Sequence, residues 1–200
     1  MAARARLHVA SANPGKLREY QELAAGHSME LSTVPDIARL PRFDESAPTF
    51  AENAAGKAVH YSRFVDTPVI ADDSGLVVPG LGGAPGVHSA RYGGPRASDS
   101  DRIRKLLAEL REKVVCERCA RFVCALALAE RGCVRAVFSA AVEGELLEAP
   151  RGAEGFGYDP IFFFPPLGKT LAELTREEKN QHSHRGQAFR KLLAFFEEQP

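Results

Sequence analysis

Residues 7–24 read LHVASANPGKLREYQELA, and this stretch decides the fold class of the chain. It opens with a short apolar run, Leu7-His8-Val9-Ala10, which is typical of a strand. The run ends at Ser11-Ala12-Asn13-Pro14-Gly15, and a helical pattern follows from about Pro14 to Leu23. Proline is favoured at the first position of a helix because its missing N–H would have no partner there. A chain that opens with strand, turn and helix predicts an α/β fold.

Helices and strands continue to alternate further along the chain. Thr49-Phe50-Ala51-Glu52 has the form of a capping box and predicts a helix that extends to about Val65. Residues 69–78 predict a buried strand with Asp72 and Asp73 at its end or at a bulge. Residues 79–97 contain six Gly and three Pro, which predicts a long irregular loop.

The second half of the chain also contains sequence patterns that predict helices and strands. Residues 98–101 predict a helix start, and residues 120–142 predict two strands that turn at Arg131-Gly132. We expect another strand over residues 156–164, a second capping box at residues 170–173, and a final helix with Phe189 and Phe196 on its apolar face. No linker separates these pieces. The chain is therefore predicted to be one domain, residues 1–200, with two lobes around a cleft.

Composition excludes several classes of protein. The hydrophobic fraction of 44% and the charged fraction of 26% are ordinary for a soluble globular chain of 200 residues. Lys and Arg number 26, as do Asp and Glu, so the basic bias of a nucleic-acid-binding protein is missing. No run of apolar residues is long enough to span a membrane, and no secretory signal is recognisable at the N-terminus. We expect a cytoplasmic protein that binds neither nucleic acid nor membranes.

Two polar motifs could bind a phosphorylated ligand. The turn from Ser11 to Lys16 leads into a helix, whose first N–H groups favour an anion, and Lys16 adds a positive charge. An ordinary strand-to-helix turn with a surface lysine would look the same. Asp72-Asp73-Ser74-Gly75 interrupts an apolar strand, where acids are costly unless they are exposed, paired or metal-bound. Adjacent strand residues face opposite sides, so only one Asp can point into a given cleft.

Each of three further groups of residues is too weak a signal to indicate a function unless it is taken together with the others. Asp44-Glu45 could supply a second carboxylate for Mg²⁺, or could be a solvated acidic turn. Phe156-Gly157-Tyr158-Asp159 could stack on a nucleobase, or could be buried aromatics at a strand entry. Lys179 and Ser183-His184-Arg185-Gly186 could contact a substrate, although a lone Arg on a helix is usually solvated.

The cysteines do not indicate a metal site or a redox function. Cys116 and Cys119 form a lone CxxC pair without a second pair of zinc ligands, and Cys124 and Cys133 lie in apolar strand patterns. We expect four thiols, with Cys124 and Cys133 packed as small apolar residues.

Taken together and in this order, the motifs resemble the inosine/xanthosine triphosphate pyrophosphatase family from about residue 7 to residue 196. Besides the groups above, the matching set includes Thr49-Phe50-x-Glu52-Asn53-Ala54, Gly82-Gly83-Ala84-Pro85-Gly86 and Ala172-Glu173-Leu174-Thr175. The resemblance implies an elongated mixed sheet flanked by helices around a central substrate cleft, and a homodimer. It also implies Mg²⁺-dependent hydrolysis of ITP, dITP and XTP to the monophosphate and pyrophosphate.

The resemblance also implies roles for individual residues. Asp73 matches the general base and, with the Asp44-Glu45 pair, the metal ligands. Family members often have two Glu where this chain has Asp44 and Glu45, so which of the two binds the metal stays open. The residues that match substrate contacts are Ser11, Ala12, Asn13, Pro14, Gly15, Lys16, Lys57, Ser74, Phe156, Gly157, Tyr158, Asp159, Lys179, His184 and Arg185.

Two other functions are weighed against this one. A pyrophosphatase of the Maf group, which acts on modified pyrimidine nucleotides, would not be expected to carry Ser183-His184-Arg185-Gly186. The presence of Asp73, Lys16 and Lys57 together favours an enzyme over a nucleotide-binding protein without catalysis. For base selection, Arg185 and His184 can donate hydrogen bonds to a 6-oxo group, whereas the 6-amino group of adenine would leave such donors unpaired.

Overall fold

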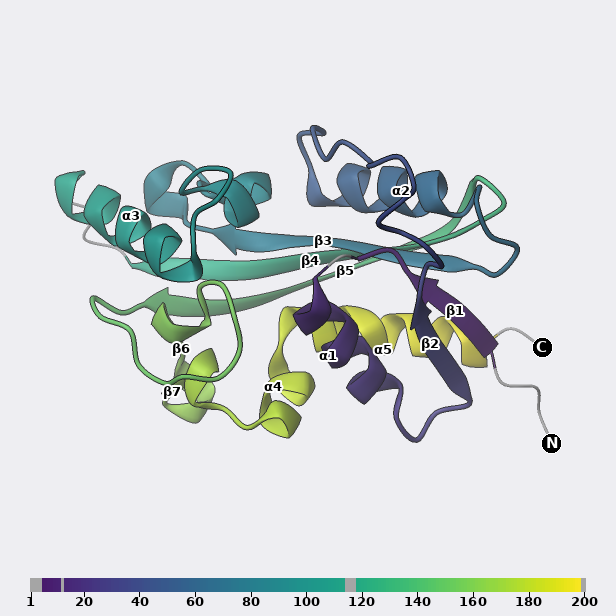
Figure 1. Ribbon diagram of the computed structural model, residues 1–200. Helices are drawn as coiled ribbons and strands as arrows, with labels where there is room; N and C mark the ends of the chain where they lie inside the picture. Colours follow the sequence, from purple (N-terminus) through teal and green to yellow (C-terminus); the bar gives the residue numbers. More distant parts are fainter. Residues whose placement is uncertain (1–4, 12, 114–117, 199–200) are drawn as a thin grey trace. The chain divides into compact units, whose positions relative to one another are not determined.

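The computed structural model describes residues 5–11, 13–113 and 118–198, and it contains a seven-stranded sheet flanked by helices (Figure 1). The strand order is β2-β1-β3-β4-β5-β6-β7. β2, β1 and β3 are parallel, whereas β5, β6 and β7 are antiparallel, so the sheet is mixed. The predicted α/β class with a mixed sheet is confirmed.

The chain divides into two compact units. The first unit comprises residues 1–73, 124–140 and 185–200, and the second comprises residues 74–123 and 141–184. Three long strands contribute residues to both units: β3 (Val69–Val77), β4 (Cys119–Glu130) and β5 (Cys133–Leu146).

In the first unit, β1 (Ala5–Val9) lies between two parallel neighbours. α1 (Pro14–Ala24) connects it to β2 (Met29–Thr33), which pairs along its whole length. α2 (Phe50–Tyr61) precedes β3, which pairs with the last two residues of β1. Successive connections therefore lead to opposite sides of β1, which makes its carboxyl end a topological switch point.

The helices of the first unit cover both faces of its part of the sheet. Ile70 of β3 belongs to the core that contains Tyr20 of α1 and Phe189 of α5 (His184–Glu197). Its neighbour Ala71 belongs to a different core, which contains Ala54 of α2. Because side chains alternate along a strand, each successive residue of β3 up to Asp73 faces either α1 and α5 or α2.

The second unit has its own core. α3 (Asp99–Glu112) begins where the sequence predicted a helix start and contributes Ile103, Leu106, Leu107 and Leu110, which share one helical face. β6 (Phe162–Phe164) pairs with β5, and β7 (Lys169–Thr170) pairs with β6. α4 (Arg176–His182) follows. The 3-10 helices are Pro79–Leu81, Gly86–Arg91, Asp159–Ile161, Pro165–Leu167 and Leu171–Glu173.

Several local predictions are confirmed. Thr49 caps α2, its hydroxyl oxygen accepting from the Glu52 N–H at 3.2 Å. Arg131 and Gly132 join β4 to β5, and both have a positive φ (49° and 79°), as a two-residue hairpin turn between twisted strands requires. The predicted box at residues 170–173 is present, although it caps a 3-10 helix of one turn.

Two strand predictions were wrong in detail. Asp72 and Asp73 lie inside β3, so the first of the two predicted positions, the end of the strand, is wrong. Both side chains are buried, and each has partners described below. The expected strand over residues 156–164 is reduced to β6. Gly155 and Gly157 have φ values of 78° and 65°, which a strand cannot accommodate, and a 3-10 helix follows them. Among the described residues, no helix combines the length and the apolar character needed to cross a membrane.

Candidate active site

The switch point at the end of β1 brings the first group of predicted residues together. The Ala10 N–H donates to the Ile70 carbonyl of β3 at 2.8 Å, and Asp72 follows two residues later on β3. The turn that carries Ser11 and Lys16 therefore begins beside Asp72. In open α/β sheets, ligands bind outside the carboxyl ends of the strands at such a switch point.

The turn itself is organised by two side chains. Ser11 Oγ accepts a hydrogen bond from the Asn13 N–H at 3.2 Å. Asn13 is the N-cap of α1, and its Oδ1 accepts from the N–H groups of Gly15 (2.8 Å) and Lys16 (3.4 Å). Pro14 occupies the first turn, as predicted. The predicted contact residue Ala12 lies outside the described residues.

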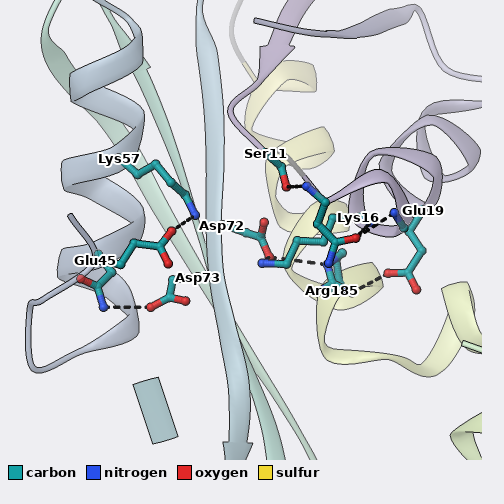
Figure 2. A network of polar contacts seen from close by, with 11 residues as sticks. Ser11, Lys16, Glu19, Glu45, Lys57, Asp72, Asp73 and Arg185 are labelled. Carbon is teal, nitrogen blue, oxygen red and sulfur yellow. Dashed lines mark hydrogen bonds and ion pairs between the residues drawn. The ribbon is translucent and has the colours of Figure 1, made fainter. Parts of the chain in front are cut away.

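Asp72 faces α1 and α5 and forms the centre of a buried cluster of charges (Figure 2). Its Oδ2 lies 2.8 Å from Lys16 Nζ and 3.6 Å from Arg185 Nε. Arg185, itself 2% exposed, also forms an ion pair with Glu19 of α1. Burial alone would raise the pKa of Asp72, but the positive charges of Lys16 and Arg185 outweigh it and hold this pKa well below the usual range.

Asp73 faces α2 and has a different environment. Its Oδ2 accepts a hydrogen bond from Asn53 Nδ2 at 3.0 Å. Asn53 is held in turn by the backbone of Ala47, to which its amide both donates and accepts. Burial raises the pKa of Asp73, the Asn53 hydrogen bond opposes that rise, and the negative charge of Glu45 adds to it. A carboxylate with a raised pKa is suited to accepting a proton.

Glu45, rather than Asp44, lies among the side chains around Asp73. Glu45 Oε1 lies 2.5 Å from Lys57 Nζ, and Figure 2 shows both side chains on the Asp73 side of β3. Asp44 is exposed to solvent. Burial would lower the pKa of Lys57, but the carboxylates of Asp72 and Glu45 raise it, so that Lys57 stays protonated.

The donors on this side of β3 fit a hard cation. The described residues contain no cluster of three or more His, Cys, Asp or Glu that could bind a metal without further ligands. Mg²⁺, however, is commonly held by one or two carboxylates together with substrate phosphates. Glu45 and Asp73 are two such carboxylates. The two negative charges repel each other, and a cation bound between them would relieve this repulsion.

The second unit contains the other predicted contact residues. Asp159 Oδ2 accepts from Lys179 Nζ and from the Phe156 N–H, both at 2.8 Å, and Lys179 Nζ lies 4.8 Å from the centre of the Phe156 ring. Lys179 belongs to α4, not to the last helix. Gly155 is required here, because a Cβ on it would lie 2.2 Å from Asp159 Oδ2.

Three more predicted residues are held within the second unit. The Gly157 N–H donates to Asp99 Oδ2 at 2.6 Å, and the Tyr158 hydroxyl donates to the Ser89 carbonyl at 3.1 Å. The ring of His184 is buried and stacks on Phe122, with 4.8 Å between centroids and 7° between planes.

The structure thus brings the predicted residues together in two groups, one in each unit. The first group is Ser11, Asn13, Pro14, Gly15, Lys16, Glu45, Lys57, Asp73 and Arg185, and the second is Phe156, Gly157, Tyr158, Asp159, Lys179 and His184. Ser74 is half-buried and is the first residue of the second unit. Arg185, expected to contact the base, directs its guanidinium to Asp72 and Glu19.

The sequence analysis assigned no role to two supporting residues, Asn53 and Glu19. Asn53 could have been found, because it lies three residues after Phe50 on the apolar face of a capped helix, where a polar side chain needs a partner. Glu19 gave no such signal, since an acid on a surface helix is ordinary.

The cysteines follow the prediction in part. Cys124 is buried, and burial together with the charge of Asp72 raises its pKa to about 12, so it is an unreactive thiol. Cys119 and Cys133 are exposed, so the predicted packing of Cys133 was wrong. Its strand alternates in exposure, and residue 133 falls at the exposed hairpin end. Cys116 lies outside the described residues.

Comparison with known proteins gives one consistent result. Residues 7–195 match the model of the Ham1 family. The chain is 52% identical to the dITP/XTP pyrophosphatase of Geobacillus kaustophilus over 95% of this chain and 93% of that protein. It is 48% identical to a dITP/XTP pyrophosphatase of Thermus thermophilus, over 96% of this chain and 92% of that protein.

Solved structures agree. A HAM1 protein from Coxiella burnetii superposes with a TM-score of 0.88 at 40% identity, covering 97% of this chain and 99% of the other. The nucleoside-triphosphatase / dITP/XTP pyrophosphatase of Mycobacterium abscessus gives a TM-score of 0.74 at 38% identity, covering 94% and 98%. The family match, the identity to these relatives and the shared fold show that this chain belongs to the Ham1 family.

Proposed function

We propose that this chain hydrolyses the non-canonical purine nucleotides dITP, XTP and ITP to the nucleoside monophosphate and pyrophosphate. The observation that carries the proposal is the pair Asp72 and Asp73, which are adjacent on β3 beside the turn from Ser11 to Lys16 but lie in opposite electrostatic environments. When two neighbouring carboxylates have pKa values that differ strongly, one typically stays ionised while the other acts in proton transfer. The names of the relatives supply the substrate class.

The phosphate chain of the substrate would bind at the first turn of α1. The N-terminal end of a helix carries a positive partial charge that favours anions, and Lys16 extends from the same turn. Lys57 supplies a second ammonium group from α2. Both lysines already have carboxylate partners, which hold the ammonium groups in place before substrate binds.

In the proposed reaction, Asp73 accepts a proton from the attacking water. The water oxygen forms a bond to the α-phosphorus, the bond from that phosphorus to the oxygen bridging to the β-phosphorus breaks, and pyrophosphate leaves. Asn53 fixes the orientation of Asp73 through its 3.0 Å hydrogen bond. The buried surroundings of Asp73 favour its protonated form after the transfer.

Mg²⁺ is the proposed cofactor, with Glu45 and Asp73 as its protein ligands. When bound, it would neutralise phosphate charge and orient the phosphate oxygens. Asp44, the alternative left open by the sequence, is exposed and so is the weaker candidate.

The purine base would be read in the second unit. Phe156 offers an aromatic face for stacking, and Lys179 and Asp159 supply a donor and an acceptor beside it. Lys179 can donate to the 6-oxo group of hypoxanthine or xanthine, whereas adenine presents an amino donor at that position.

Three further properties belong to the proposal. The chain would act as a single domain, which the one family match over residues 7–195 supports. It would form a homodimer and work in the cytoplasm, as the resemblance implies. The Maf-group alternative is not favoured by the names of the relatives.

A nucleotide panel tests the function. Purified protein with Mg²⁺ is given dITP, XTP, ITP, ATP and GTP, and pyrophosphate and orthophosphate are measured separately. Release of pyrophosphate from the first three, with little turnover of ATP or GTP, supports the proposal. Orthophosphate as product, or nucleotide binding without turnover, would contradict it, the second result favouring a non-catalytic binding protein.

A further inference from the structure

The loop that carries Phe156 is tied to the rest of the second unit at two points. On one side, Asp159 accepts from the Phe156 N–H, and Lys179 lies over the Phe156 ring. On the other side, the Gly157 N–H donates to Asp99 Oδ2 at 2.6 Å, across 58 residues of sequence. The two peptide groups on either side of Phe156 are therefore both held by carboxylates.

Asp99 is not needed to cap the helix on which it lies. Ser98 is the N-cap of α3, and Ser98 and Asp101 form the complete capping box. The Asp99 carboxylate is instead shared between the loop and Arg102, whose Nη2 donates to Oδ1 at 2.7 Å. Arg102 Nη1 donates in turn to the Ala90 carbonyl at 2.7 Å, which anchors the carboxylate to a second segment.

Side-chain packing leaves space between the loop and α3. A cavity of about 630 Å³ lies between them, lined among others by Ile103, Leu107, Phe156 and Pro160. Asp99 and Gly157 both line it, so their hydrogen bond lies at the wall of this cavity. Gly157 has a φ of 65° and no side chain, so its backbone has the freedom to change conformation if this bond is lost.

We propose that Asp99 is a positioning residue for nucleobase binding. By holding the Gly157 peptide, its carboxylate fixes the Phe156 ring in the orientation that stacks on the purine. This inference rests on the proposed function, in which Phe156 contacts the base. A hydrogen bond from a backbone N–H to a carboxylate is among the stronger ones in proteins, which suits a contact that must hold a glycine-rich loop.

Three variants separate this role from a merely structural one. Asp99→Ala removes the acceptor, Asp99→Asn keeps an acceptor oxygen without the charge, and Asp101→Ala is the matched control because it disturbs the same helix terminus without touching the loop. For each we would measure kcat and KM for XTP, the dissociation constant of IMP by calorimetry, and the melting temperature.

Asp99→Ala should raise KM and weaken IMP binding by about tenfold, with kcat within about twofold of wild type, as expected for the loss of one charged hydrogen bond. Asp99→Asn should recover most of the affinity, and Asp101→Ala should lower the melting temperature while KM stays unchanged. Unchanged KM and IMP affinity in Asp99→Ala would overturn the inference. So would an equal rise in KM in Asp101→Ala, or a failure of Asn to restore binding.

The calorimetric measurement separates this inference from the function on which it rests. A wild-type protein that binds IMP but hydrolyses no nucleotide would refute the proposed function, and a weaker binding in Asp99→Ala would still support the role of Asp99. A wild-type protein that hydrolyses XTP and shows no effect of Asp99→Ala would refute the role of Asp99 alone.

Discussion

Asp72 and Asp73 are consecutive residues of β3, and their carboxylates bind partners on opposite faces of the sheet. Asp72 contacts Lys16 at 2.8 Å on the side of α1 and α5, and Asp73 contacts Asn53 of α2 at 3.0 Å. The alternation of side chains along a strand gives two acids of the same type different surroundings. One is held ionised by positive charge, and the other is poised to take up a proton.

Replacement of Asp73 tests the assignment of the base. Asp73→Asn keeps the shape of the side chain but cannot accept a proton, and general bases typically contribute about 10²–10⁴-fold to the rate. We expect kcat to fall by at least about 100-fold, with an unchanged circular dichroism spectrum. Asp66→Asn, at an exposed position in the same unit, is the control and should leave kcat unchanged. A variant that keeps more than about a tenth of the wild-type rate would show that Asp73 is not the base.

Replacement of Asp72 should act mainly on stability. Asp72→Asn leaves the buried Arg185 and Lys16 without their shared partner, and breaking a buried ion pair in this way costs about 3–5 kcal/mol. Urea unfolding at pH 7 in metal-free buffer measures this loss. Asp36→Asn, whose side chain is 73% exposed, should have little effect. Equal unfolding free energies for Asp72→Asn and wild type would show that the charge cluster does not stabilise the fold.

The same pair of proteins should show a defined pH dependence. Because the pKa of Asp72 is lower in the folded than in the unfolded state, its contribution is present above the unfolded value of about 4 and is lost as the pH falls below it. The difference in unfolding free energy between wild type and Asp72→Asn should therefore shrink between pH 5 and pH 3. A difference that grows over this range would contradict the direction of the shift.

Metal dependence should separate Glu45 from Asp44. Chelation with EDTA should stop hydrolysis, and added Mg²⁺ should restore it, because Glu45 and Asp73 offer only hard oxygen ligands. Glu45→Gln should require a higher Mg²⁺ concentration for half-maximal activity, whereas Asp44→Asn should behave as wild type. Full activity in EDTA would remove the metal from the proposal, and an effect of Asp44→Asn alone would exchange the two ligands.

The local parts of the fold were predictable because their signals are local. The turn from β1 into α1 is indicated by Pro14 and by Asn13, which caps the helix. The β4–β5 hairpin is indicated by Arg131-Gly132. The candidate residues could be named from the order of their motifs. Their grouping could not, since it depends on contacts between distant segments.

Two sites show why distance in sequence limits prediction. Arg185 pairs with Glu19 across 166 residues, so its role as the centre of a buried charge cluster cannot be read from its neighbours on α5. Residues 156–164 are rich in aromatics and predict a strand by pattern. Two glycines with positive φ turn the first part into a loop, and its tie to Asp99 is set by tertiary structure.

The position of Arg185 changes the prediction for base selection. Its guanidinium binds two carboxylates, whereas Lys179 lies beside Phe156 with its side chain 8% exposed. The ammonium N–H that faces the 6-amino group of adenine would find no acceptor there, at a cost of about 1–3 kcal/mol. Lys179→Met should therefore lower the ratio of kcat/KM for ITP over ATP by about tenfold or more. Arg185→Ala should lower the melting temperature and leave that ratio within about twofold. The measurement is kcat/KM for both nucleotides in wild type and both variants. A collapse of the ratio in Arg185→Ala, with none in Lys179→Met, would return base reading to Arg185.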